Sequence, residues 1–309
     1  MNVTFRQLRV FAEVVRQGSV LRAAEALHLS PPAVSMQIKE IESQVGLALF
    51  DRAGRRLSLS TAGEYFVVYA RRLLGTLKEA DDAMARFKGV ESGLLTIGMV
   101  GSATYFLPRL LAQFQAEHPA VAVRLRLGNR EQLVALMQAN EIDVSVMGRS
   151  PKEWPNRAEP FAMHPHVLVT APNHPFAKAE SVPAAMLARE PFIVREPGSG
   201  TRAALEEYLA EHRLQPIFIM ELQSDEAIKQ VVMAGLGVGL VSLHSIGLEW
   251  RNALIAAPHV EGLPLMRRWH LVNAAARALS PAAEAFRYFV LERGEAQLAA
   301  MFGDEAPSP

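Results

Sequence analysis

Apolar residues recur at helical spacing through the first 45 residues and predict three short helices. The first helix has one apolar face, formed by Phe5, Leu8, Phe11 and Val15. The second helix, residues 20–27, turns the small Ala23 and Ala24 inward, where another helix can approach closely. The third helix runs from about residue 31 to 45 and ends before Gly46. Its buried stripe consists of Val34, Ile38, Ile41 and Val45.

A short hairpin with a basic tip follows the three helices. Two apolar segments, residues 47–52 and 56–59, flank a turn that contains Gly54. Three helices with a tight connection between the second and the third predict a winged helix-turn-helix, with the hairpin as its wing. The same pattern also fits a small helical domain with a solvated basic loop, so helix count alone does not establish DNA binding.

The exposed side of the third helix and the tip of the hairpin carry the candidate DNA contacts. Ser30 is a suitable N-cap and Pro31 fits the first helical position, so the helix begins where base edges would be nearest. Arginines in the hairpin can contact phosphates or the minor groove. The expected DNA-binding residues are Ser30, Pro31, Pro32, Ser35, Met36, Lys39, Arg52, Arg55 and Arg56.

A heptad pattern occupies residues 61–89. Seven apolar residues alternate at spacings of four and three: Phe66, Ala70, Leu73, Leu77, Ala80, Met84 and Phe87. So narrow a stripe favours a helix pair between two chains, and two symmetric DNA half-sites also require a dimer. The alternative is a single amphipathic helix that lies on its own domain.

Strands and helices alternate through the rest of the chain, which predicts an α/β domain with parallel sheets. The expected strands are 94–99, 121–127, 142–147, 166–169, 191–195, 217–222, 238–242 and 269–272. The expected helices are 106–117, 131–140, 201–212, 225–234 and one from about 280. The chain returns to its first unit at the end, so two lobes should enclose a ligand cleft. Lobe I is expected at about 90–162 and 267–309, and lobe II at about 163–266.

Composition and charge restrict the class of protein. The 309 residues include no cysteine, which excludes disulfides, thiol catalysis and thiolate metal sites. No apolar run reaches the roughly 18 residues of a membrane span and the N-terminus lacks a secretory signal, so a cytoplasmic protein is expected. The net charge is zero, but residues 1–61 carry eight basic and five acidic residues, which is +3, and the remainder carries −3. This asymmetry matters because the basic part also contains the helix-turn-helix.

The sequence contains no enzyme motif. The glycines of segment 235–239 precede a strand instead of following one, so they do not form a dinucleotide-binding fingerprint. The segment 198–200 lacks the spacing of a nucleophile elbow. His164, His166 and His174 have no carboxylate cluster near them in the sequence. We therefore expect a protein that is not an enzyme, with no catalytic site, no metal and no cofactor.

Residues 19–63 closely resemble the LysR-type transcriptional regulators. The motifs that carry the resemblance are Ala23-Ala24 with Leu27, Pro32-Ala33-Val34-Ser35-x-Gln37-Ile38-Lys39-x-Ile41-Glu42, Gly46-Leu47-x-Leu49-Phe50-Asp51-Arg52 and Leu59-Ser60-Thr61-Ala62-Gly63. Two positions depart from the family, which usually has Gln or a similar polar residue in place of Pro31 and often Arg in place of Met36. A missing Gln removes a candidate adenine contact, so the departures concern which bases are recognised.

The resemblance covers essentially the whole chain and implies its organisation. It implies a winged helix-turn-helix DNA-binding domain (1–60), a linker helix for dimerisation (61–89) and a two-lobed effector-binding domain (90–309) similar to periplasmic binding proteins. The implied partners are double-stranded promoter DNA, a small-molecule effector and further copies of the chain, as a dimer through the linker helix and a homotetramer. A transcriptional activator of this kind would also meet RNA polymerase at the promoter.

Within the family, the sequence is most similar to the CbbR group, which regulates carbon-fixation operons. The segments that carry this similarity are 129–131, 147–151, 164–169, 195–202 and 228–235. The similarity implies a phosphorylated metabolite as effector, while the residues themselves indicate a small anion that bears either a carboxylate or a phosphate. The alternatives are a LysR-type regulator of another metabolic operon, and a ligand-binding module without a DNA function.

The segment 195–202 is the best candidate for holding the anion. A strand ends there, a turn with two glycines follows, and a helix starts at Thr201, where free backbone amides attract negative charge. Alternatively, the glycines only make a tight turn and Arg202 pairs with Glu206. Ser102 and Thr104 follow the first strand, at the place where α/β lobes bind ligands. Alternatively, these two residues serve only as helix caps. The expected effector-binding residues are Ser102, Thr104, Asn129, Met147, Arg149, Arg195, Ser199, Thr201 and Arg202.

Overall fold

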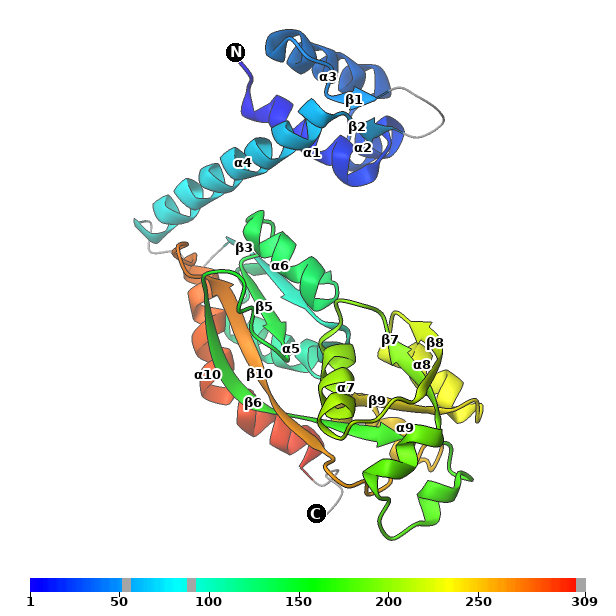
Figure 1. Cartoon of the computed structure of the whole chain (residues 1–309). Helices are drawn as coiled ribbons and strands as arrows, with labels where there is room; N and C mark the ends of the chain where they lie inside the picture. Colours follow the sequence, from blue (N-terminus) through cyan, green and yellow to red (C-terminus); the bar gives the residue numbers. More distant parts are fainter. Residues whose placement is uncertain (52–56, 88–92, 304–309) are drawn as a thin grey trace. The chain divides into compact units, whose positions relative to one another are not determined.

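The chain folds into two compact units (Figure 1), a helical unit that extends through α4 (Thr61–Phe87) and an α/β unit that begins at β3 (Gly93–Met99). The computed structural model describes residues 1–51, 57–87 and 93–303. The predicted wing residues Arg52, Arg55 and Arg56 lie outside these ranges. No helix within the described ranges is long and apolar enough to cross a membrane.

The helical unit has the predicted helix-turn-helix. Its elements are α1 (Phe5–Gln17), α2 (Val20–Leu27), α3 (Pro31–Val45), β1 (Phe50–Asp51), β2 (Ser58–Leu59) and α4. Local signals explain the bounds of α3, because Ser30 Oγ accepts a hydrogen bond from the amide of Ala33 at 3.3 Å and Gly46 ends the helix with a φ of 77°. Ala23 and Ala24 are buried in the core of this unit, where their small size lets α1 and α3 pack against α2.

The predicted heptad stripe of the long helix α4 is buried in one part and exposed to solvent in another. Phe66 and Ala70 pack into the core of the helical unit, where Phe66 meets the ring of Phe11. Leu73 and Met84 are 49% and 55% exposed, and Ala80 is exposed as well. Leu77 is partly buried, and the side chain of Phe87 lies outside the described part. The start of α4 also exposes three apolar side chains that the heptad pattern did not include, Tyr65, Val68 and Tyr69. The helix thus packs on its own unit at its start and presents apolar residues to solvent farther along.

The α/β unit has two lobes and two strands that run through both. Lobe I contains β3, α5 (Leu107–Glu117), β4 (Val121–Leu127), α6 (Arg130–Gln138), β5 (Val144–Met147) and α10 (Pro281–Phe302). Lobe II contains β7 (Pro191–Arg195), α7 (Gly200–Glu211), β8 (Ile217–Leu222), α8 (Asp225–Met233), β9 (Val238–Ser242) and α9 (Gly247–Arg251). The short helical turns are η1 (Gly101–Tyr105), η2 (Pro175–Lys178), η3 (Ala184–Arg189) and η4 (Leu243–Ser245). The crossing strands are β6 (Asn156–Val169) and β10 (Leu265–Ala274).

The strands form one sheet in the order β4-β3-β5-β10-β6-β9-β7-β8. Pairing is parallel inside each lobe, as predicted, since β3 runs parallel to β4 and β5, and β7 runs parallel to β8 and β9. The crossing strands differ from the prediction, because β10 is antiparallel to β5 and β6, and β6 is antiparallel to β9. Both crossing strands are also longer than predicted. Pro160 and Pro165 interrupt the apolar pattern of β6, and proline is a signal against a strand interior.

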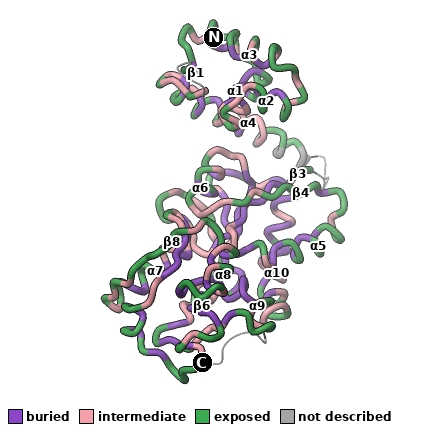
Figure 2. Tube along the Cα trace, turned by 90° about the vertical axis from the view of Figure 1, so that its right-hand side faces the viewer, coloured by how far each residue is buried: buried purple, intermediate pink, exposed green. Residues whose placement is uncertain are grey.

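Each lobe has an apolar core of its own. In lobe I, Phe106 packs edge-on against Trp269 with ring centroids 4.9 Å apart, and Phe114 from α5 meets Phe286 from α10. In lobe II, Phe192 and Tyr208 lie in the corresponding cluster. The inner strands β5 and β9 are buried, whereas the edge strand β8 is mostly exposed (Figure 2). These cores hold the strand ends in place, and the loops that follow the strands are free to carry function.

Candidate functional site

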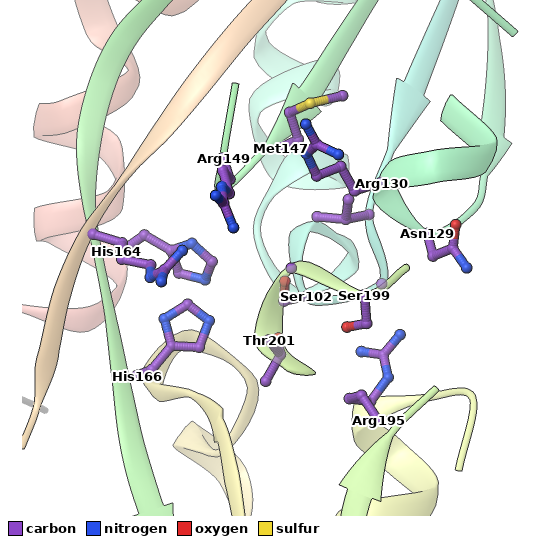
Figure 3. Close-up of a pocket in the computed structure, with 15 residues that line it drawn as sticks. Ser102, Asn129, Arg130, Met147, Arg149, His164, His166, Arg195, Ser199 and Thr201 are labelled. Carbon is purple, nitrogen blue, oxygen red and sulfur yellow. The ribbon is translucent and has the colours of Figure 1, made fainter. Parts of the chain in front are cut away.

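A pocket lies between the two lobes at the carboxyl ends of their parallel strands (Figure 3). The empty space within it, open solvent at its edge included, amounts to about 440 Å³. The loops after β3, β4 and β5 line it from lobe I, and the end of β7 with the start of α7 lines it from lobe II. Seven of the residues expected at an effector site line this pocket: Ser102, Asn129, Met147, Arg149, Arg195, Ser199 and Thr201.

Two residues expected at the effector site do not line the pocket. Thr104 in η1 is exposed and lies outside the lining. Arg202 in α7 pairs with Glu206 at 2.6 Å, and its guanidinium lies over the ring of Phe218 at 4.6 Å. The pair with Glu206 is the alternative that the spacing of the two residues had left open. Arg202 therefore ties α7 to β8 instead of facing a ligand.

Arg195 is a buried cation at the end of β7. Its Nη1 donates to the carboxylate of Asp225 at 2.6 Å, and its Nε donates to Glu196 at 2.9 Å. Burial by itself would lower the pKa of Arg195, but the carboxylates of Asp225 and Glu196 raise it above its ordinary value. The guanidinium therefore keeps its charge at the wall of the pocket, in a position set by Asp225, Glu196 and the carbonyl of Gln223, to which Nη2 donates at 3.2 Å.

The start of α7 provides unused hydrogen-bonding capacity. Ser199 is the N-cap residue, but within the described chain its hydroxyl makes no capping hydrogen bond, which leaves it available to a ligand. Thr201 in the first turn is buried and lines the pocket, and Ser102 lines it from the opposite lobe. The first amides of a helix have no acceptor within the helix and attract negative charge. This part of the pocket can therefore bind an anion.

Two histidines of β6 line the pocket, and sequence analysis did not place them there. His164 and His166 lie on the same face because side chains alternate along a strand, and their ring centroids are 4.2 Å apart. The ring of His164 stacks on Trp269 at 3.7 Å. Burial lowers the pKa of His166 to about 3 and the pKa of His164 well below its ordinary value, so both rings are neutral at pH 7. The Nδ1 atom of each is buried and has no hydrogen-bond partner among the described residues.

Two further arginines line the pocket without having been expected. Arg130 follows β4 and donates two hydrogen bonds of 2.8 Å to Glu153, and these bonds lower the pKa of Glu153 to about 2. Arg267 stands on β10 directly opposite His164 of β6. Only the pairing of the two crossing strands brings Arg267 to the pocket, and no local pattern in the sequence signals that pairing. Within the described residues, no group of three or more His, Cys, Asp or Glu residues could hold a metal ion.

The other candidate site is the exposed face of α3. Pro31, Pro32 and Lys39 are exposed, Met36 is 53% exposed and Ser35 is partly buried. The opposite face is buried, as Val34, Ile38 and Ile41 show. The start of α3 is therefore open to a partner, with a capped N-terminus that includes Ser30.

Two family models cover most of the chain. Residues 5–64 match the model described as "Bacterial regulatory helix-turn-helix protein, lysR family". Residues 88–295 match the model described as "LysR substrate binding domain". The first match covers the helix-turn-helix, and the second covers both lobes around the pocket.

Similar proteins match nearly the full length. The chain is 45% identical over 305 residues to the HTH-type transcriptional regulator CfxR of Cupriavidus necator, which covers 99% of this chain and 96% of that protein. It is 43% identical over 291 residues to a RuBisCO operon transcriptional regulator of Allochromatium vinosum, covering 94% and 96% of the two chains. The α/β unit is similar to the regulatory domain of CcmR from Synechocystis PCC6803, solved in complex with 2-PG, with 33% identity and a TM-score of 0.63 over 65% of this chain and 97% of that one.

Proposed function

This chain belongs to the LysR family of DNA-binding transcriptional regulators, and we propose that it controls carbon-fixation genes in response to a small phosphorylated anion. The similarity to CfxR and to a RuBisCO operon regulator over almost the whole chain supports the choice of target genes. The relative that was solved with 2-PG supports the choice of effector, because 2-phosphoglycolate is a small phosphorylated anion.

Two features of the pocket support the proposal, a buried cation and a helix N-terminus with available hydrogen-bond donors. Arg195 keeps its charge at the pocket wall, and the unused hydroxyl of Ser199 and the buried Thr201 stand at the N-terminus of α7. Hydrogen bonds to an ionised group are shorter and stronger than those between neutral groups, and a helix start adds its own positive potential. A phosphoryl group suits this arrangement better than an uncharged sugar would.

The test is calorimetry of the full-length protein with 2-phosphoglycolate. Thr201→Val should weaken binding about tenfold or more, because a hydrogen bond to a charged group contributes about 1.5–3 kcal/mol. Thr104→Val is the matched control, since this hydroxyl lies in η1 but outside the pocket lining, and it should leave the affinity unchanged. The proposal fails if the wild-type protein binds neither 2-phosphoglycolate nor inorganic phosphate, or if the two variants bind equally well.

The effector signal would travel through closure of the two lobes. A ligand held by both lobes favours the closed arrangement, and the spacing of the DNA-binding units in an oligomer would change with it. A promoter footprint measured with and without 2-phosphoglycolate tests this step. The same footprint in both conditions would contradict it.

DNA recognition would use the exposed start of α3 in a dimer formed through α4. Lys39 would contact a phosphate, while Pro32, Ser35 and Met36 would face the bases together with the neighbouring Ser30 and Pro31. The exposed apolar side chains of α4, Leu73 and Met84, would meet those of a second chain, and two such dimers would form the expected tetramer.

Two substitutions separate DNA contact from dimerisation. Leu73→Glu should reduce the mass of the assembly in light scattering and lower promoter affinity at least tenfold, because the second half-site is no longer bound in the same complex. Lys39→Gln should keep the assembly intact, weaken binding to all sequences alike and reduce the salt slope by about 1 for each recognition helix. An unchanged mass for Leu73→Glu would rule out this part of α4 as the dimer contact.

A further inference from the structure

Glu207 of α7 pairs with two of the arginines that line the pocket. One carboxylate oxygen lies 3.0 Å from Nη1 of Arg149, and the other lies 2.5 Å from Nη2 of Arg267. Arg149 follows β5 in lobe I, Glu207 belongs to lobe II, and Arg267 stands on the crossing strand β10. Both arginines line the pocket, whereas Glu207 does not. A single carboxylate therefore links the two lobes through arginines of the pocket.

The other arginines of the pocket have partners within their own lobe. Arg195 pairs with Asp225 and Glu196. The side chain of Asp225 is 1% exposed, so its movement away from Arg195 would leave a buried charge without a partner. Arg130 is held by Glu153, and both belong to lobe I. Among these carboxylates, Glu207 is the one whose bonds join the lobes.

The exposure of Glu207 makes it displaceable. Its side chain is 55% exposed, so it can turn into water and remain solvated after giving up its partners. Exposed ion pairs contribute little free energy, because the carboxylate is hydrated almost as well as it is paired. An anion that enters the pocket would therefore meet Arg149 and Arg267, which an exposed carboxylate holds weakly, and Arg195, whose partner Asp225 is buried.

We propose that Glu207 is a built-in competitor of the effector, which holds Arg149 and Arg267 in the ligand-free protein and gives them up to an incoming anion. Because the same carboxylate bridges the lobes, it also holds them together when no effector is bound. The free energy of effector binding is then the free energy gained from contacts with the two arginines minus the free energy lost when Glu207 releases them. This inference rests on the proposed function, since it requires that an anion bind in the cleft.

The experiment compares Glu207→Gln with Glu206→Gln in the full-length protein. Glu206 is the neighbouring residue of the same helix, is 53% exposed, and pairs with Arg202 outside the pocket, so the control removes the same charge without freeing a pocket arginine. Calorimetry with 2-phosphoglycolate should show about five- to tenfold tighter binding for Glu207→Gln and a change of less than about twofold for Glu206→Gln, since two weak ion pairs no longer oppose the ligand. Amide hydrogen exchange in the ligand-free protein should quicken at residues 147–149 and 200–205 in Glu207→Gln alone.

The outcomes separate the inference from the proposed function. If the wild-type protein binds 2-phosphoglycolate and Glu207→Gln binds it equally or more weakly, the competitor is disproved and the effector site stands. If only Glu207→Gln binds the anion, the competitor is strongly supported. If neither protein binds 2-phosphoglycolate, both the competitor and the proposed effector site are disproved. Unchanged hydrogen exchange in Glu207→Gln would disprove the link between the lobes, whatever the calorimetry shows.

Discussion

Replacing Arg195 with Met is expected to lower the free energy of unfolding of the α/β unit by about 3–5 kcal/mol and to abolish binding of 2-phosphoglycolate. The side chains of Arg195 and Asp225 are 7% and 1% exposed, so the variant leaves Asp225 buried without its cation. All three tryptophans of the chain, Trp154, Trp250 and Trp269, belong to this unit, so fluorescence during urea denaturation reports its stability directly.

Arg202→Met is the matched control for Arg195→Met. It removes an ion pair with the exposed Glu206 and the contact with the ring of Phe218, so we expect a loss of about 1–2 kcal/mol, smaller than that of Arg195→Met, and unchanged binding of the anion. The double variant Arg195→Met with Asp225→Asn should recover part of the stability but none of the binding, because the buried charge is gone while the cation is still missing. Equal losses of stability in Arg195→Met and Arg202→Met would contradict the inference that burial of the Arg195–Asp225 pair causes the larger loss.

Replacing Gly63 with Ala is expected to destabilise the helical unit by at least about 2 kcal/mol and to weaken promoter binding at least tenfold. Gly63 lies in the first turn of α4, and a Cβ added there would stand 2.0 Å from the carbonyl oxygen of Leu49 and 2.9 Å from Leu59 Cδ2. The first of these atoms belongs to the backbone, so the hairpin would have to move away from α4. The helical unit contains no tryptophan, so its transition should shift in circular dichroism at 222 nm while fluorescence stays unchanged.

Gly200→Ala provides the comparison for Gly63→Ala. Gly200 also lies in the first turn of a helix, α7, but a Cβ added there would meet no atom within 4 Å. The substitution should therefore leave stability unchanged or raise it slightly, because alanine favours the helix over glycine. A similar loss in both variants would show that backbone flexibility, and not the contact with Leu49, is what Gly63 provides.

The elements whose limits depend on neighbouring residues were predictable from the sequence. The helix α3 begins after the cap at Ser30 and ends at Gly46, as expected, because both signals act on the adjacent backbone. The strands β4, β7, β8 and β9 have the predicted bounds, since each is a short segment rich in apolar residues between turn residues. The gathering of the predicted pocket residues also follows from local information, because loops after parallel strands meet at one edge of a sheet.

Contacts between residues far apart in the sequence determined the remaining features of the pocket and of α4. His164 and Arg267 meet in the pocket only because β6 and β10 pair in one register, and Glu207 links Arg149 to Arg267 only because the lobes face each other. Likewise, the heptad stripe of α4 left open whether it pairs with a second chain or lies on its own domain, and the structure packs Phe66 into its own unit while Leu73 stays exposed. Periodicity along the chain specifies which face of an element is apolar, and the contacts that cover that face come from residues far away in the sequence. The family of the protein and the edge of the sheet at which its pocket lies were therefore contained in local patterns, whereas the partners of each charged group came from the tertiary structure.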